Sequence, residues 1–596
     1  MLVLAMSLAA TSAPIHAQTK TTTKTHKKTK ASSELEEQLR AMRETESRMQ
    51  VQIDELRQQL ADRDAKLTGA AQVVQDARAQ AAQATAKTAE ISETVQQEDD
   101  RVKDLQGQIN TLGVTDAAAV KTVADDQKKM ATAVESPATL HYKGVEITPI
   151  GFFAAESTYR TRSLNSDINT PFNATLFPGA AQAHTSEFNF TGRQSRIGAL
   201  VTGSLPWAKL GGYFEADFLS AGATSNENQS NSYTLRQRQI FGQALFTGGL
   251  SVYGGQMWSL VTETKTGVDP RTEVLPQTPD AAYHVGFSWA RQPGVRIAQK
   301  VGIATYAMSL EESEYIFSAN NANPNFFFGA PGVSGGVFNA FNGNYSNNVA
   351  PDVIVKASFD PKFGHFEVGG IARFFRDRHY LGYGLGVNGA GTTVPNGNGT
   401  NDTKIGGGFF ANAHVPMTKY FTLGAHLMQG DGVGRYGTST LPDITVHPDG
   451  TLAPIRSSQG LLSLEFHPAP KLDLFGYAGG EYAQRTVYRD PVSGKLVGYA
   501  PITANVAGCN TEYTPTSNTG YAPGIANNCA ASTRALLEGS AGFAYRFYQG
   551  PKGRLQYSMM YSYLDRAAWT GTIGSGTGAP KGTNNMVFTS FRYYIP

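Results

Sequence analysis

The chain has 596 residues, too many for one ordinary domain, and its 51 Lys and Arg nearly balance its 49 Asp and Glu. A net charge of +2 gives no indication of bulk nucleic-acid binding, and no segment holds about 18 consecutive apolar residues, which excludes a membrane-spanning helix. The 63 Gly, 26 Tyr and 31 Phe residues are typical of membrane β-barrels, whose strands turn only alternate residues toward lipid. A soluble all-β protein can share this composition, so the pattern along the chain has to decide.

The N-terminal residues predict export. Residues 1–17 are small and apolar and end in Ile15-His16-Ala17, which predicts a signal peptide cleaved before Gln18. No Lys or Arg precedes the apolar stretch, so the true start of the chain stays open. Residues 18–32 hold a Thr/Lys tract without a core-forming side chain, which predicts a disordered segment.

Residues 33–113 carry a heptad repeat and predict a long α-helical coiled coil, since a sustained 3.5-residue spacing requires partner helices. Such a rod would reach roughly 115 Å at 1.5 Å per residue. Its Ala-rich middle leaves the number of helices open, and a single solvated helix is the alternative. Residues 114–144 are expected to form a linker. The apolar heptad positions include Leu35, Leu39, Met42, Met49, Ile53, Leu56, Leu60, Leu67, Val74, Ile91, Val95, Val102, Leu105, Ile109 and Leu112.

Within 145–596 the period changes to two, which predicts an all-β transmembrane barrel of sixteen antiparallel strands. Most of these strands are long enough to cross a bilayer at a tilt. The expected strands are 147–160, 187–203, 208–219, 233–246, 249–258, 281–291, 294–310, 353–360, 363–376, 403–415, 419–429, 457–467, 471–485, 534–548, 552–565 and 585–595.

Short and long connections alternate between these strands. Seven tight turns, such as Asp360-Pro361-Lys362, alternate with eight long loops rich in Gly, Asn, Ser and Thr. Sixteen strands with both termini on the short-turn side require this arrangement, whereas a soluble sandwich has no reason to segregate its loops by length. The long loops are expected at 161–186, 220–232, 259–280, 311–352, 377–402, 430–456, 486–533 and 566–584.

Apolar and polar side chains lie on opposite faces of single strands, which predicts a lipid-facing surface and a water-filled lumen. In 552–565, the apolar face holds Leu555, Tyr557, Met559, Tyr561 and Tyr563, and the polar face holds Arg554, Gln556 and Ser558. In 208–219, Tyr213, Glu215 and Asp217 lie opposite Leu210, Gly212 and Phe214.

Three segments resemble the DcaP-like family of trimeric outer-membrane porins. They are Gly211-Gly212-Tyr213-Phe214-Glu215-Ala216-Asp217-Phe218, Leu235-Arg236-Gln237-Arg238-Gln239 and Gly255-Gln256-Met257-Trp258-Ser259. That family combines a coiled coil with a sixteen-stranded barrel, so the resemblance covers the mature chain and implies a homotrimer that passes small anionic organic acids, dicarboxylates among them. Ser195-Arg196-Ile197-Gly198 is similar to the second strand of general porins, which implies that Arg196 points into the pore. The end at Pro596 departs from the aromatic residue with which such barrels usually finish and puts the assembly signal in doubt.

Charged residues inside the expected strands are the candidate selectivity residues, because a lipid-facing Arg near the bilayer midplane costs about 2–4 kcal/mol. The pore-lining candidates are Arg196, Arg236, Arg238, Arg296, Arg373, Arg376, Glu215 and Asp217. The loop 259–280 occupies the position of the porin constriction loop and carries Lys265 and Arg271. For each arginine, a structural ion pair in the wall is the alternative to a role in selectivity.

No enzymatic activity, cofactor or metal is expected. Gly332-Val333-Ser334-Gly335-Gly336 matches the nucleophile pattern G-x-S-x-G, but it lies in an Asn/Gly-rich loop where the strand-to-helix turn of that motif is not expected. His365, His414, His426 and His467 lack metal-ligand spacing.

Cys509 and Cys529 are the only two cysteines, and both lie in the loop 486–533. An exported protein meets oxidising conditions, so the sequence predicts a disulfide between them.

The sequence therefore predicts a porin in the cell outer membrane, in contact with its lipid, with the rod in the periplasm. Small polar and preferentially anionic solutes are the expected cargo. In one alternative the barrel is an anchor whose rod tethers the membrane to peptidoglycan. In another, the long loops carry an enzyme or adhesin, for which the sequence offers no nucleophile and base.

Overall fold

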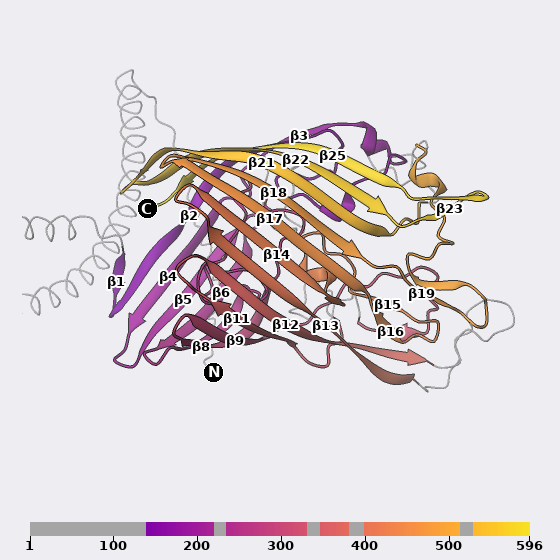
Figure 1. The fold of residues 1–596 in the computed structure, drawn as a ribbon, viewed down its shortest axis with the longest axis horizontal. Helices are drawn as coiled ribbons and strands as arrows, with labels where there is room; N and C mark the ends of the chain where they lie inside the picture. Colours follow the sequence, from indigo (N-terminus) through magenta and orange to yellow (C-terminus); the bar gives the residue numbers. More distant parts are fainter. Residues whose placement is uncertain (1–138, 220–233, 330–345, 381–398, 513–528) are drawn as a thin grey trace, which may run out of the picture. The chain divides into compact units, whose positions relative to one another are not determined.

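The computed structural model describes residues 139–219, 234–329, 346–380, 399–512 and 529–596 (Figure 1), which belong to one compact unit, Val134–Pro596. The expected signal peptide, disordered Thr/Lys segment and coiled coil, and the G-x-S-x-G match, lie outside the described residues. No helix among the described residues is long and apolar enough to span a membrane.

Sixteen antiparallel strands form a closed barrel, because β2 pairs with β4 on one side and with β25, the last strand, on the other. The wall strands are β2 (Val145–Arg160), β4 (Arg196–Ser204), β5 (Ala208–Asp217), β6 (Arg236–Phe246), β7 (Leu250–Trp258), β8 (Arg291–Val301), β9 (Ala304–Glu311), β11 (Asp352–Phe359), β12 (His365–Tyr380), β13 (Gly399–Pro416), β14 (Phe421–Asp431), β17 (Arg456–Ala469), β18 (Leu472–Ala483), β21 (Thr533–Gly550), β22 (Gly553–Ala568) and β25 (Lys581–Tyr594).

Short elements extend the wall or lie in its loops. Three short strands join the main sheet: β1 (Leu140–Tyr142), β3 (Glu187–Thr191) and β10 (Phe326–Phe327). The loops hold the hairpins β15 (Ile444–Val446) with β16 (Leu452–Pro454), β19 (Thr486–Arg489) with β20 (Leu496–Tyr499), and β23 (Gly571–Ile573) with β24 (Gly576–Gly578). They also hold the 3-10 turns η1 (Phe172–Ala174), η2 (Ala181–His184), η3 (Gly434–Tyr436) and η4 (Ala507–Cys509). The small hairpins gather at the end of the barrel opposite the short turns (Figure 1).

The alternation within strands separates an outer from an inner face. On β22, Tyr561 and Tyr563 are 47% and 42% exposed, whereas Met560 and Leu564 are buried inside. The same register puts Tyr213, Glu215 and Asp217 of β5 inside and Leu210 and Phe214 outside.

Two expected strands near the middle of the chain were wrong, although the total of sixteen was right. Residues 281–290 form part of a loop, and 294–310 divides into β8 and β9 around a two-residue turn at Gly302, whose φ is +61°. Gln292-Pro293-Gly294, expected as a turn, lies inside β8. The two errors cancel in the strand count. The expected strand 281–291 is absent over 281–290, whereas the expected single strand 294–310 forms two strands. The tight turn at Gly302 lacks the proline that marked other turns.

A break in the second strand keeps its aromatic residues outside. Residues 192–195 separate β3 from β4 and shift the alternation, so Phe188 and Phe190 on β3 and Ile197 on β4 all face outward. A register shift between Glu215 and Ala216, where β5 pairs with β6, has the same effect on β6. It places Phe241 inside together with Arg236 and Arg238, although Phe241 has the opposite parity in the sequence.

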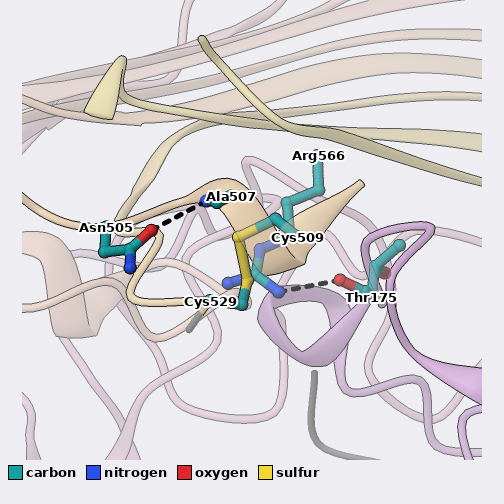
Figure 2. Close-up of a disulfide and its surroundings, with 6 residues drawn as sticks. All are labelled: Thr175, Asn505, Ala507, Cys509, Cys529 and Arg566. Carbon is teal, nitrogen blue, oxygen red and sulfur yellow. Dashed lines mark hydrogen bonds between the residues drawn. A yellow bond between two sulfur atoms is a disulfide. The ribbon is translucent and has the colours of Figure 1, made fainter. Parts of the chain in front are cut away.

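The two cysteines form a bridge within one loop at the long-loop end. Cys509 and Cys529 form a disulfide with an S–S distance of 2.05 Å (Figure 2), and Cys509 is fully buried. Arg566 at the end of β22 lies beside it and donates to the carbonyl of Thr175, 2.7 Å away, in the loop after β2. The disulfide therefore packs where the first and seventh long loops meet.

Replacing both cysteines by Ser should loosen this loop and leave the barrel folded. The chain-entropy model gives a loop of this size about 3 kcal/mol of stabilisation, and strand pairing does not depend on it. Limited proteolysis should cut 484–532 faster in the variant, while heat-modifiable gel mobility stays unchanged. Two free thiols in the unreduced wild-type protein would contradict the pairing.

Candidate functional site

The loop 259–290 leaves β7 after Trp258, passes through the inside of the barrel and returns to the wall at Arg291. Leu260 of the loop donates a hydrogen bond to Glu311 on β9, and Val285 of the loop donates one to Glu538 on β21. Because these strands lie far apart around the wall, the loop crosses the lumen and narrows it.

Four buried glutamates of the wall accept backbone N–H groups of this loop. A buried carboxylate and a buried N–H group each need a partner, so wall and loop satisfy one another. The pairs are Leu260 N to Glu311 at 2.8 Å, Thr264 N to Glu367 at 3.1 Å, Gly286 N to Glu481 at 2.9 Å and Val285 N to Glu538 at 2.8 Å.

Two buried cations hold the first half of the loop through its carbonyl groups. Lys356 on β11 donates to Thr262 O at 3.0 Å and forms an ion pair with Glu367 at 2.8 Å. Arg296 on β8 donates to the carbonyls of Trp258 and Val268 at 2.7 and 2.9 Å. Arg296 was expected to line the pore, and it does point inward, but the loop covers it and only 2% of its surface is exposed.

Glycines allow the loop backbone to lie directly on the wall. Gly286 has φ +87°, and a Cβ at this position would overlap the carbonyl oxygen of Gly460 on β17. A Cβ on Gly479 of β18 would overlap the carbonyl oxygen of Val285. No other residue type fits this approach without displacing the loop.

The apolar residues in 281–287 explain why this segment resembled a strand. Ala281, Ala282, Tyr283, Val285 and Phe287 are buried in a cluster inside the barrel. They pack against inward-facing side chains that include Leu461, Phe475, Tyr477 and Leu536. Their apolar character thus serves packing in the lumen and not contact with lipid.

Arg196, Arg236 and Arg238 meet Glu215 and Asp217 on the inner face of β4, β5 and β6. Arg236 binds both oxygens of Asp217 at 2.9 and 2.8 Å, and Arg238 binds Glu215 at 2.7 Å and Asp217 at 2.8 Å. Arg196 lies 3.4 Å from Glu215. The side chain of Arg238 is 2% exposed, against 17% for Arg196 and 31% for Arg236. Arg238 is therefore a structural pair in the wall, and the other two reach the lumen.

Arg373 also holds loops and is fully buried. It forms ion pairs with Asp352 at 3.0 Å and with Asp443 of the loop 432–455 at 2.8 Å, and it donates to the carbonyl groups of Gly432 and Glu314. Its position inside the barrel agrees with the expected register, but solute in the lumen does not reach it.

Arg376 lies on the outer face, contrary to its expected place in the pore. It shares the register of Val368, which is 53% exposed, and alternates with the inward-facing Arg373 and Phe375. Successive side chains on a strand face opposite sides, so two residues separated by three positions also face opposite sides. Because Arg373 faces inward, Arg376 faces outward.

Lys265 and Arg271 of the loop are both exposed. Arg271 lies over the ring of Tyr213 at 4.9 Å. Lys265 lines a cavity of about 370 Å³ at the short-turn end of the barrel. The wall residues around this cavity include His414, Glu465, His467, Asp473 and Arg546. Neither loop cation forms an ion pair with a described residue.

Three inward-facing arginines on the last strands were not among the expected site residues. Arg546 on β21 pairs with Asp473, and Arg592 on β25 pairs with Glu156 at 2.7 Å. Arg554 on β22 lies over the ring of Tyr594 at 3.7 Å and forms no ion pair with a described residue. Alternation with Phe591 and Tyr593 could have placed Arg592 inside from the sequence.

Burial raises the pKa values of carboxyl groups in the loop and so reduces its negative charge. The segment 259–290 carries four carboxyl groups and two cations. Burial raises the pKa of Glu273 to about 7 and that of Asp280 to about 6, and burial together with the nearby Glu367 raises the pKa of Glu263. At neutral pH the loop is thus less negative than its sequence suggests.

Comparison with solved structures places this architecture. The outer membrane channel DcaP of Acinetobacter baumannii aligns with a TM-score of 0.51 and 13% identity, over 76% of this chain and 99% of that one. The chain has the fold of the DcaP channel. An anion-selective porin from Comamonas acidovorans aligns at a TM-score of 0.40 and 10% identity, over 76% and 100% of the two chains. Comparisons with protein-family models and with curated proteins found no match.

Within this DcaP fold, Gly286→Ala should displace the loop from the wall. A non-glycine residue at positive φ costs about 1–2 kcal/mol, and the new Cβ would overlap Gly460. Single-channel recordings should show a larger and more variable conductance. Gly254→Ala is the matched control, because a Cβ there meets nothing within 4 Å. Equal conductance in both variants would contradict this role of Gly286.

Arg238→Gln should destabilise the barrel by about 3 kcal/mol, because it leaves two buried carboxylates with weaker compensation. Arg236→Gln should cost less, since Arg236 is partly exposed and Arg238 still neutralises Asp217. Urea titration of barrel unfolding in detergent measures both. A larger loss of unfolding free energy in Arg236→Gln than in Arg238→Gln would contradict the structural role of Arg238.

Proposed function

We propose that this chain is an outer-membrane porin through which small polar solutes, preferentially anions, diffuse without catalysis. The sixteen-stranded barrel with an apolar outer face, seven short turns and a loop folded into the lumen supports this proposal. In the proposed orientation, the short turns lie on the periplasmic side of the membrane and the long loops lie on the side of the cell exterior.

The proposed anion preference rests on the charged groups that remain accessible in the lumen, among which cations outnumber carboxylates. Glu311, Glu367, Glu481 and Glu538 are buried and bind the loop, and Asp217 is buried between two arginines. Among the described residues, Arg554 and the two loop cations have no ion-pair partner. Against these three cations, Asp269 is the one exposed carboxyl group of the loop 259–290. We therefore infer that solvent meets more positive than negative charge along the passage, and rings of such charge set ion selectivity.

Dicarboxylate-type organic acids are the solute class that fits best. A dianion gains about twice the attraction of a monoanion from the same cations. Arginine also binds carboxylates through two parallel hydrogen bonds. Arg196, Arg236, Arg271 and Arg554 lie inside the barrel with part of their surface accessible.

The assembly proposed is a homotrimer with the heptad segment 33–113 as a periplasmic rod. Three barrels bring three copies of this segment together, which gives the repeat its partners. The alternative function is a tether to the cell wall through the same segment. Conductance in planar bilayers separates the two, because a tether need not conduct.

The double variant Arg271→Gln and Arg554→Gln should reduce anion preference. Removing two unit charges about 10 Å from a passing anion should lower the anion-to-cation permeability ratio roughly twofold after salt screening. The reversal potential across a salt gradient measures this ratio. Arg456→Gln with Lys581→Gln is the matched control, because both cations face outward and pair with carboxylates. An equal shift in the control, or none in the lumen variant, would contradict the proposal.

Deleting residues 31–115 should leave a barrel that folds and conducts, since the wall closes by strand pairing alone. The fraction of trimer on native gels should fall if the rod reinforces assembly. Complete failure of the truncated protein to insert would show that barrel and rod are not separate units.

A further inference from the structure

The outer face of β12 changes abruptly from apolar to basic. Phe366, Val368, Gly370, Ala372 and Phe374 face outward in turn, and Arg376 and Arg378 continue the same register. On the neighbouring strand β13, Phe409 and Ile405 face outward at 52% and 71% exposure. Beyond them, Thr403 and Asn401 pair directly with Arg376 and Arg378. The apolar wall thus ends in a patch of four polar residues, which we call the β12 patch.

The position of the β12 patch along the strand puts it at the level of lipid headgroups. Phe366 and Phe374 are about 26 Å apart along a strand that rises 3.3 Å per residue, or about 20 Å across a bilayer at a tilt near 40°. This approaches the apolar band of about 25 Å found on membrane barrels. The patch lies at the long-loop end, which the proposed orientation assigns to the outer leaflet.

The two arginines of the patch have no carboxylate to neutralise them among the described residues. Arg378 donates to the side-chain oxygen of Asn401 at 3.1 Å and lies 5.7 Å from the ring of Tyr380. The Nε of Arg376 is buried and has no hydrogen-bond partner.

Two other outward-facing cations at this end are paired with carboxylates. Arg456 lies 2.9 Å from Asp431, and Lys581 lies 3.4 Å from Asp565. The two arginines of the β12 patch differ from Arg456 and Lys581 because no described carboxylate compensates them. Two uncompensated guanidinium groups beside lipid require an anion.

We infer that the β12 patch binds the phosphate group of a lipid in the outer leaflet. Arg376 and Arg378 lie two residues apart on one face, about 6–7 Å along the strand, so both guanidinium groups can reach one doubly charged phosphate. Thr403 and Asn401 supply further hydrogen-bonding groups, and Ile405 and Phe374 lie where the acyl chains begin. The inference rests on the proposed outer-membrane location, which supplies the lipid.

The test compares phosphorylated lipid A, the same lipid after dephosphorylation, and inorganic phosphate as probes for the full-length protein in detergent. Native mass spectrometry counts the bound lipid. The double variant Arg376→Gln and Arg378→Gln should weaken binding of the phosphorylated lipid at least tenfold, since each lost hydrogen bond to a charged group is worth about a factor of ten. Dephosphorylated lipid should bind weakly to both proteins.

The control removes two other outward cations by Arg456→Gln and Lys581→Gln and should keep the affinity for phosphorylated lipid. Equal losses in control and test variant, or equal binding of dephosphorylated lipid, would overturn the inference. Binding of inorganic phosphate with the same dependence on the two arginines would also overturn it, in favour of an ion site. If the Gln variant does not fold, the variant with Lys at both positions should fold and bind more weakly than wild type, and unchanged binding would count against the arginines.

Conductance separates this inference from the proposed function. Because the patch faces outward, the Arg376 and Arg378 variant should conduct as the wild type does. A changed reversal potential would show that these side chains reach the lumen, which contradicts their placement. Failure of the wild type to conduct would contradict the porin proposal. The lipid-binding comparison would still support or contradict the inference about the β12 patch.

Discussion

The hydrogen bonds between buried wall carboxylates and the backbone of the loop 259–290 determine the shape of the lumen. Glu311, Glu367, Glu481 and Glu538 would each be costly to bury alone, and so would the N–H groups that they accept. Together they hold a segment with little regular structure across the barrel. Gly286 and Gly479 make the close approach possible, because any side chain there would push the loop away.

The same contacts set the charge that a solute meets. Each glutamate bound to the loop is withdrawn from the passage, whereas Lys265, Arg271 and Arg554 keep no ion-pair partner among the described residues. Under the proposed function, a chain with a formal charge of only +2 would thus present a basic lumen. Net charge describes the whole molecule, but selectivity depends on which charges remain in contact with water.

Arginine has three roles in this barrel, and burial and register distinguish them. Arg238 and Arg373 are enclosed by carboxylates and hold strands and loops together. Arg196 and Arg236 are paired but partly exposed to the lumen. Arg376 and Arg378 face outward where the apolar band ends, which places them beside lipid headgroups in the proposed orientation. The residue type alone would have assigned all of them to the pore.

The sequence by itself determined the alternation of short turns and long loops over most of the barrel and the two faces of strands such as β5 and β22, whereas its total of sixteen strands depended on two errors that cancelled. These features follow from a period of two and from turn residues, which are local properties of the chain. The outward position of Arg376 was also available from its three-residue distance to Arg373. Only the tertiary structure decided that 281–290 is a loop, since its apolar side chains pack against Leu461, Phe475, Tyr477 and Leu536, which are far away in the sequence. It also decided which charges remain accessible, because a carboxylate's partner across the lumen depends on the path of the loop and not on its neighbours in sequence.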